Sequence, residues 1–375
     1  MYPFNASPGF RPAAPVFATF GDESGVDTRH GQFILGWDTA SQIASQLPAQ
    51  RYRVTAARLT LRTLREGSFL NDSTEDPWAS YLPTNSVSYR PDTDPGRPVE
   101  LFGAGFRNGF TAESYLEDSP FGSSSVARRN AFAAGYNERG ELVDVSNNVG
   151  KTNSEQLPFV ARPFAVGTIA QVPNGEPVPA GAAVVFEFNL IDPFVVKYLQ
   201  TALSEGRLRL SVTWLGESGG LGGSPQYPDF ATRENILQDP PRLELAGVVF
   251  GEEDSDSDGL SDDWERHFWG NLEKAAGDDS DADGRTNLEE WGWGTDPTVA
   301  ISVVRLNGLN LRKDGRVRLE FTAGSAGRYV VEWSDDLRTW TRPAGEFRFP
   351  AIRAGEWTSF DSQSPSAGYF RLRPE

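Results

Sequence analysis

One acidic stretch repeats carboxylates at a spacing that suits a metal ion. Its first loop carries them at positions 1, 3, 5, 9 and 12, with a glycine at position 6: Asp254, Asp256, Asp258, Asp262, Glu265 and Gly259. A second loop, 25 residues further on, repeats the pattern with Asp279, Asp281, Asp283, Asn287, Glu290 and Gly284. Calcium takes six to eight oxygen ligands from a tight loop that ends in a bidentate Glu. Together with the position-7 carbonyls of Leu260 and Arg285, the pattern predicts two calcium ions.

An acidic run of this kind is also typical of a solvated linker. The agreement of both copies at each ligand position argues against that interpretation. Residues 252–297 resemble the calcium loops of EF-hands, and more closely those of dockerins and thrombospondin type-3-like repeats in secreted bacterial proteins. The resemblance implies that each loop binds one calcium ion.

Short apolar patterns follow each loop. Trp264 and Phe268 are spaced i, i+4, and Leu288 and Trp291 are spaced i, i+3, which predicts two short helices packed on each other. The simplest role for the tryptophans is the core of this small unit: Trp264, Trp269, Trp291 and Trp293. The alternative is that one of them stacks on a sugar ring.

Charge and composition narrow the class of protein. The chain has 375 residues, enough for two or three domains, and a net charge of -17. Residues 252–298 hold 16 Asp and Glu against three Lys and Arg, so the acidity belongs to the predicted metal loops. No basic cluster suggests nucleic acid, and no apolar run suggests a membrane span. There is no cysteine, which excludes disulfides, thiolate metal sites and a Cys nucleophile. Because loops of moderate affinity need abundant calcium, we expect a secreted or cell-surface protein, and the resemblance implies a bacterial one.

Alternating apolar residues predict an all-β protein with three parts. Residues 1–251 form the first domain, 252–298 the calcium-binding joint with two small helices, and 299–375 a small C-terminal β-sandwich. In the first domain the patterns predict strands at residues 31–39, 51–63, 100–102, 131–136, 164–169, 183–191, 207–215 and 242–250. A helix begins after Asp192, a good N-cap, and ends before Gly206. Residues 64–98 are predicted to be a long ordered loop.

Two further resemblances support this division. The strand–helix–strand run AAVVFEFNLIDPFVVKYLQTALSEGRLRLSVTWL, with the earlier FILGWDT and YRVTAARLTL, resembles the jelly-roll domains found beside carbohydrate-active modules. The segments VRLEFTA, RYVVEWSDD, RTWTRP, FRFPAI, EWTSFDS and YFRLRP resemble a C-terminal β-sandwich of secreted proteins from Planctomycetes and Verrucomicrobia. In those proteins the sandwich follows acidic calcium repeats.

Catalytic motifs are lacking, so no residue is assigned a catalytic role. There is no G-x-S-x-G, H-E-x-x-H or Walker sequence, and FGAGFRNGF (102–110) is interpreted as a turn-rich loop. His30 and His267 lie in distant segments and are expected to be structural or solvated. A glycosidase pair is defined by distance in space, so loop carboxylates stay open as candidates: Asp76, Glu113, Asp118, Asp229 and Glu234.

Two functions remain in view. We expect a non-enzymatic extracellular calcium-binding protein that binds a glycan or matrix component, or assembles with itself through sheet edges. The alternative is a polysaccharide-cleaving enzyme, or an accessory module of one, that uses carboxylates in the loops of the first domain.

Overall fold

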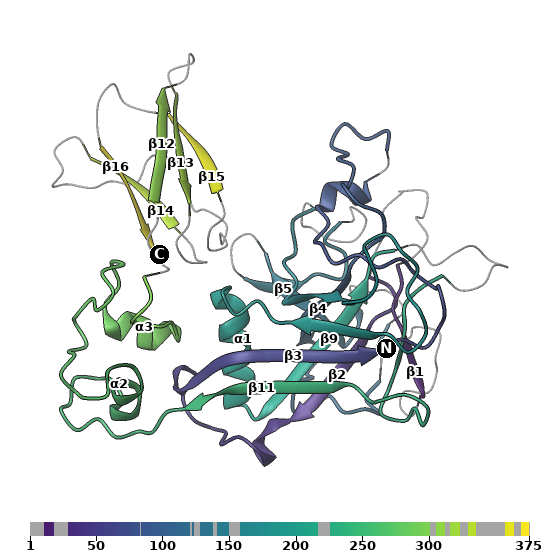
Figure 1. Cartoon of the computed structure of the whole chain (residues 1–375), viewed down its shortest axis with the longest axis horizontal. Helices are drawn as coiled ribbons and strands as arrows, with labels where there is room; N and C mark the ends of the chain where they lie inside the picture. The colour runs from purple at the N-terminus through teal and green to yellow at the C-terminus, as the bar shows by residue number, and fades with distance from the viewer. Residues whose placement is uncertain are drawn as a thin grey trace.

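The computed structural model describes residues 11–18, 29–82, 84–120, 122–123, 128–137, 141–149, 158–216 and 226–300, together with the backbone of five strands between 305 and 374. The described chain is mostly antiparallel sheet with three α-helices (Figure 1). This confirms the β-rich class predicted from alternating apolar residues. Within the described residues, no helix combines the length and hydropathy needed to cross a bilayer.

The described residues between 13 and 249 include eleven strands and one α-helix. The strands are β1 (Ala13–Pro15), β2 (Phe33–Asp38), β3 (Tyr52–Arg62), β4 (Val99–Phe106), β5 (Ala131–Tyr136), β6 (Leu142–Asp144), β7 (Ala165–Thr168), β8 (Ala183–Glu187), β9 (Arg207–Trp214), β10 (Asp229–Ala231) and β11 (Arg242–Val249). The helix is α1 (Pro193–Ser204), and short 3-10 turns are η1 (Thr39–Ser41), η2 (Ala49–Arg51) and η3 (Trp78–Tyr81).

Strand β4 is where the main sheet divides. One edge of β4 pairs with β9, which in turn pairs with β2. The other edge pairs with β7 through Glu100 and Leu101, and with β5 from Gly103 onward. From β7 the sheet continues through β8 and β3 to β11. The sheet therefore curls, and its largest apolar cluster includes Leu59, Leu101, Phe186 and Leu210, each almost fully buried.

The clearest sequence patterns are confirmed at residue level. In β3, Ala57, Leu59 and Leu61 are buried, while the side chains between them are more exposed, as a strand with one face toward a core requires. Helix α1 begins after Asp192, whose carboxylate accepts a hydrogen bond from the amide of Phe194.

The FGAGFRNGF interpretation is wrong for its first half, because β4 continues to Phe106 and only the following residues form a turn. Its glycines serve close packing. A Cβ on Gly103 would lie 2.6 Å from the ring of Tyr198, and one on Gly105 would lie 2.3 Å from Phe132. Glycine inside a strand often marks such a close approach rather than a turn. The short strands β1, β6 and β10 were not predicted.

The C-terminal segment contains a three-stranded and a two-stranded antiparallel sheet. The first joins β12 (Arg305–Leu311), β13 (Arg316–Thr322) and β15 (Trp357–Gln363), and the second joins β14 (Tyr329–Ser334) and β16 (Tyr369–Pro374). Four of these strands were predicted, whereas β12 was not. RTWTRP and FRFPAI, which were also predicted as strands, lie outside the described residues.

Candidate metal centres

The two acidic loops adopt the same backbone conformation. In the first, Asp254 accepts hydrogen bonds from the amides of Asp258 (3.2 Å) and Gly259 (3.0 Å). In the second, Asp279 accepts from Asp283 (3.1 Å) and Gly284 (2.9 Å). The left-handed residues also coincide, with φ of 60° and 96° at Ser257 and Gly259, and 63° and 97° at Ala282 and Gly284. Shared spacing in the sequence has therefore given a shared loop geometry.

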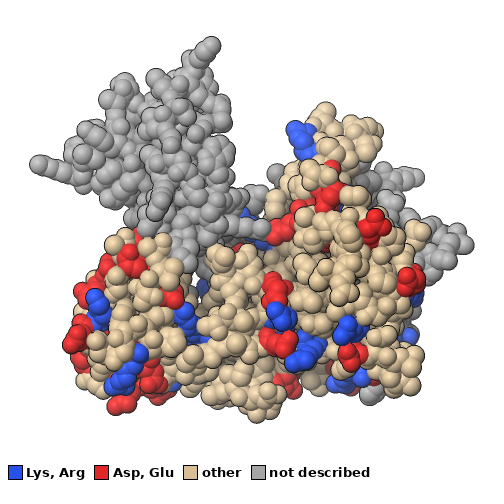
Figure 2. Space-filling model, in the orientation of Figure 1, with Lys and Arg blue, Asp and Glu red and all other residues tan. Residues whose placement is uncertain are grey.

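Each loop gathers its first three carboxylates. Oxygens of Asp254, Asp256 and Asp258 lie within 4.8 Å of one another, and so do oxygens of Asp279, Asp281 and Asp283. Oxygens bound to one calcium ion at 2.3–2.6 Å can be at most about 5.2 Å apart, so these clusters have the dimensions of a cation site. The outer edge of this acidic unit is visible in Figure 2.

The position-12 glutamates are buried, and three of their four carboxylate oxygens have no donor in the described part of the chain. Glu265 is 0% exposed and Glu290 is 1% exposed. The fourth oxygen, Oε1 of Glu290, accepts a hydrogen bond from the Thr295 hydroxyl (3.1 Å). The other three are both oxygens of Glu265 and Oε2 of Glu290. Burying an unpaired carboxylate is costly, and carboxylates are found buried when paired or bound to a metal. These oxygens are the strongest sign that the loops fit a cation.

Electrostatics lead to the same conclusion. Burial, followed by repulsion from Asp256 and Asp258, raises the pKa of Glu265 to about 7. Burial, with repulsion from Asp281 and Asp283, raises the pKa of Glu290 to about 8. A divalent cation at the carboxylates would favour their charged forms. Without one, each loop holds like charges that repel one another.

The two position-9 residues differ in their contacts. Both oxygens of Asp262 accept hydrogen bonds, Oδ1 from the amide of Ser255 and Oδ2 from the Ser255 hydroxyl and from Arg266. Asn287 donates through Nδ2 to the carbonyl of Ala275 (2.8 Å), while its buried Oδ1 has no described donor. Asp262 thus joins the later part of the first loop to Ser255 near its start. At position 7, the amides of Leu260 and Arg285 donate to Asp258 and Asp283, and ligation by their carbonyls stays a prediction.

The helices after the loops pack as predicted. They are α2 (Asp262–Trp269) and α3 (Asn287–Trp293), and both end at a left-handed glycine, Gly270 or Gly294. Helix α3 begins with a capping box between Thr286 and Glu289.

Their shared core contains Trp264, Trp291, Leu260 and Phe250, with Phe268 and Trp269 partly buried against it. A core role is therefore observed for three of the four tryptophans, and the side chain of Trp293 lies outside the described part. Leu288 was expected to face this core but is 46% exposed. Among the described side chains of the seven-residue helix α3, Trp291 is the large apolar one that is buried.

This helical unit is attached to the curled sheet. Phe250, the residue after β11, packs in the core of the unit, and its amide donates to the carbonyl of Arg51. Arg53 of β3 forms an ion pair with Asp296 (2.8 Å) and lies over the ring of Phe268 at 4.4 Å. The contacts join residues 199 to 243 positions apart.

The catalytic candidates do not form one site in the described chain. Asp229 pairs with Arg65, and Glu234 pairs with Arg233, while Asp76 lies in an aspartate cluster that contains none of the other four candidates. Glu113 and Asp118 are exposed.

The histidines lie in separate places. His30 is near Phe17, and His267 packs against Phe250. Burial and the charge of Arg129 lower the pKa of His30 to about 4. Neither histidine belongs to an acidic cluster in the described part.

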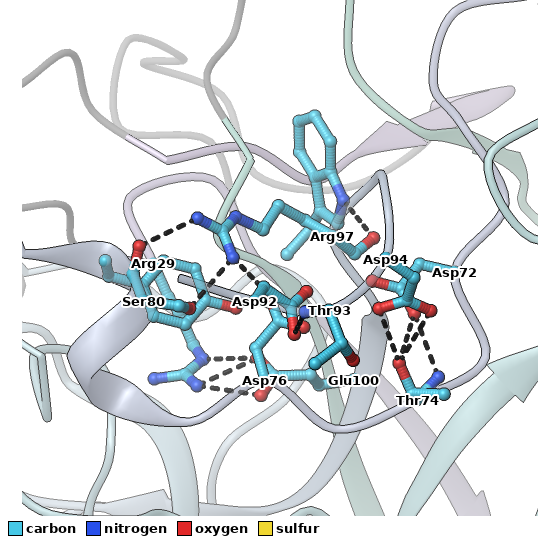
Figure 3. A network of polar contacts seen from close by, with 12 residues as sticks. Arg29, Asp72, Thr74, Asp76, Ser80, Asp92, Thr93, Asp94, Arg97 and Glu100 are labelled. Atoms are coloured by element: carbon cyan, nitrogen blue, oxygen red, sulfur yellow. Dashed lines mark hydrogen bonds and ion pairs between the residues drawn. The ribbon is translucent and has the colours of Figure 1, made fainter. Parts of the chain in front are cut away.

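A third acidic cluster was missed at the sequence level. Oxygens of Asp72, Asp76, Asp92 and Asp94 lie within 4.8 Å of one another, in the connection between β3 and β4 (Figure 3). Its two halves are 16 or more residues apart, so no loop template covers them. The available signal was the pairing of carboxylates two or four positions apart in each half.

Comparisons of the chain with protein-family models, with curated proteins and with solved structures found no match. Functional inference therefore rests on the geometry described above.

Proposed function

We propose that this chain is a secreted, non-enzymatic calcium-binding protein, in which two ions fold the segment of α2 and α3. The observation that carries the proposal is the burial of both Glu265 oxygens and of Glu290 Oε2 without a donor in the described chain, each beside three clustered aspartates. Divalent hard cations with oxygen ligands fit such sites, and the three aspartates, the position-12 Glu and the left-handed glycine favour calcium. The ligand sets proposed are those of the sequence pattern, including Asp262, Asn287 and the carbonyls of Leu260 and Arg285.

The proposed architecture has a jelly-roll-like domain (1–251), a calcium-loaded joint (252–298) and a small β-sandwich (299–375). The curled antiparallel sheet and the separate C-terminal sheets are compatible with it. Calcium then stabilises the joint and its contacts with the first domain, which include the Arg53–Asp296 ion pair. Because binding energy is available to fold such a unit, removal of the ions is expected to open it.

A binding or assembly role, rather than catalysis, is supported by the ion pairs that candidate catalytic carboxylates form in the described part of the chain. Of the five catalytic candidates, Asp76 and Asp229 are held in ion pairs with Arg97 and Arg65. The proposed partners are a glycan or an extracellular matrix component, or further copies of the chain. The fold itself does not choose among these, since β-sandwiches carry many unrelated functions.

The deciding experiment uses the purified full chain with calcium. Calorimetry measures calcium uptake, electron microscopy tests for ordered polymers, and one panel of polysaccharides is screened for retention and for released oligosaccharides. Calcium uptake at the two loops with glycan retention supports a binding role, and polymers support assembly. No uptake at these loops overturns the metal assignment. Released oligosaccharides overturn the non-enzymatic assignment and favour a polysaccharide-cleaving enzyme.

A further inference from the structure

The third aspartate cluster lies where the two halves of the long β3–β4 connection come into contact. Asp72 and Asp76 come from its first half, and Asp92 and Asp94 come from its last residues before β4. Gly96 makes this approach feasible, because it has φ of 112° and a Cβ there would lie 3.0 Å from the Cβ of Asp72. Asn174, in the β7–β8 connection, contacts the same place by donating to Asp94 (3.1 Å).

Three carboxylate oxygens of the cluster have no donor. Asp72 accepts from Thr74 through Oδ1, Asp76 from Arg97 and Tyr81 through Oδ2, and Asp92 from the amide of Thr93 through Oδ1. The second oxygen of each of these three aspartates is buried and unpartnered in the described part of the chain. Asp72 as a whole is only 3% exposed. A buried polar atom without a partner is uncommon and requires an explanation.

The described hydrogen-bond donors and cationic side chains around the cluster are too few to satisfy four carboxylates. Thr74 Oγ1 lies 2.8 Å from Asp72 and 3.1 Å from Asp94, yet a hydroxyl has one proton to donate. Arg97 is the one cation that pairs with the cluster among the described residues, and it contacts Asp76. The neighbouring Arg29 is directed at Glu100, with Nε at 2.9 Å from its carboxylate (Figure 3). The cluster therefore has an excess of negative charge.

Burial shifts the pKa of these carboxylates. It raises the pKa of Asp76 to about 7, with a further increase from Asp92 and a partly offsetting effect of Arg97. Burial also raises the pKa of Asp72, and repulsion from Asp94 and Asp92 adds to it. Both directions are those expected of carboxylates gathered without their counter-charge.

We propose that Asp72, Asp76, Asp92 and Asp94 form a third calcium site, which fastens the two halves of the β3–β4 connection to each other. The four ligand oxygens lie within 4.8 Å of one another, which one calcium ion can span. Magnesium usually takes one or two carboxylates and keeps several waters, so four carboxylates favour calcium. This site does not depend on the tandem loops, with which it shares no residue.

Calorimetric titration of the full chain with calcium chloride separates the third site from the tandem loops. We expect three ions for the wild type, two for the double variant Asp72→Asn and Asp92→Asn, and one for the double variant Glu265→Gln and Glu290→Gln. Asn at position 72 still offers an oxygen to Thr74 but lacks the charge. Asp118→Asn, at an exposed loop position, is the matched control and should bind three ions. Equal stoichiometry in wild type and the Asp72/Asp92 variant overturns the proposal.

A second measurement avoids the question of whether a variant folds. Wild-type crystals grown with terbium should show anomalous density among the four aspartates, and an empty position overturns the proposal. Titration of the Glu265/Glu290 variant in millimolar magnesium should leave its remaining calcium bound. Displacement at that concentration overturns the assignment to calcium. Failure of the tandem loops alone would leave one ion in both the wild type and the Glu265/Glu290 variant.

Discussion

At the scale of single residues, the two position-12 glutamates are the feature that distinguishes a metal-binding loop from an ordinary acidic turn. Glu265 and Glu290 are buried, and neither contacts an arginine or lysine in the described ion pairs. A buried carboxylate that lacks a cationic side chain is stabilised by a proton or by a metal ion. Their neutral analogues are therefore the sharpest probes of the loops.

Replacing either glutamate with glutamine should remove one calcium ion from the joint. Gln keeps the size of the side chain but removes the charge and one strong ligand oxygen. Changes at groups that only support a ligand cost 10–100-fold in metal affinity, so we expect about 100-fold or more here. Calorimetry of Glu265→Gln and Glu290→Gln measures this, with Glu273→Gln, exposed in the same segment, as control. Unchanged affinity in both variants would contradict the ligand assignment.

His30 should make the first domain less stable in acid. Its pKa is about 4 in the folded protein and 6.5 in an unfolded chain, so below pH 6.5 the unfolded state takes up a proton that the folded state excludes. The stabilising contribution is thus complete above pH 6.5 and is lost as the pH falls toward 4. Because the ring is partly exposed, we expect a loss of about 1 kcal/mol between pH 7 and pH 5.

Urea unfolding at those two pH values, with calcium present, tests this expectation. His30→Gln cannot take up the proton, so its free energy of unfolding should change less between pH 7 and pH 5 than that of the wild type. An equal change in both proteins would show that His30 does not titrate in this range.

At the scale of elements, the helical unit contacts β3 as well as its own loops. Arg53 joins Asp296, which follows α3, and Phe268 on α2, so one side chain fastens both ends of the unit. Such a partly buried ion pair with a cation–π contact is worth about 1–2 kcal/mol.

Arg53→Ala should therefore loosen the unit even when calcium is bound. We expect faster cleavage between residues 250 and 300 in limited proteolysis at saturating calcium. Arg58→Ala is a suitable control, since Arg58 is on the same strand and forms an exposed ion pair with Glu187. If both variants are cleaved at the wild-type rate, the contact of the unit with β3 does not stabilise it.

The sequence allowed prediction of those elements whose signal is local. The alternation of Ala57, Leu59 and Leu61 predicts β3, and Asp192 predicts the start of α1. The glycine-rich end of β4 could not be recognised, because the reason for Gly103 is the ring of Tyr198, which lies 95 positions further on. Three-residue strands such as β1 and β10 are too short to show a period, and pair only through tertiary contact.

The same distinction applies to the candidate sites. Each of the two tandem loops spans twelve residues, so spacing alone predicts which carboxylates lie close together. The cluster of Asp72, Asp76, Asp92 and Asp94 depends on how a long connection folds back on itself, which no spacing rule describes. The attachment of Arg53 to Phe268 is likewise a property of the tertiary fold.

At the scale of the whole molecule, calcium should control access to the joint. Removing the ions leaves 16 acidic against three basic residues in 252–298, and their repulsion favours an open segment. In chelator, proteases should cut within 252–298 and release a resistant fragment that ends near residue 250. Mass spectrometry of digests made with calcium and with chelator identifies the cuts. Identical digests would show that the ions do not hold the joint together.

Phe250 gives the joint a mechanical property. The Phe250 amide donates to the carbonyl of Arg51, the residue before β3, and the Phe250 ring lies in the core with Trp264. The connection between the sheet and the metal loops is therefore short and anchored at both ends. A pull on the C-terminal segment would load the two acidic loops, which hold calcium under the proposed function. Once these yielded, the roughly 47 residues of the segment would extend to about 160 Å. Calcium concentration would then set the force at which this tether lengthens.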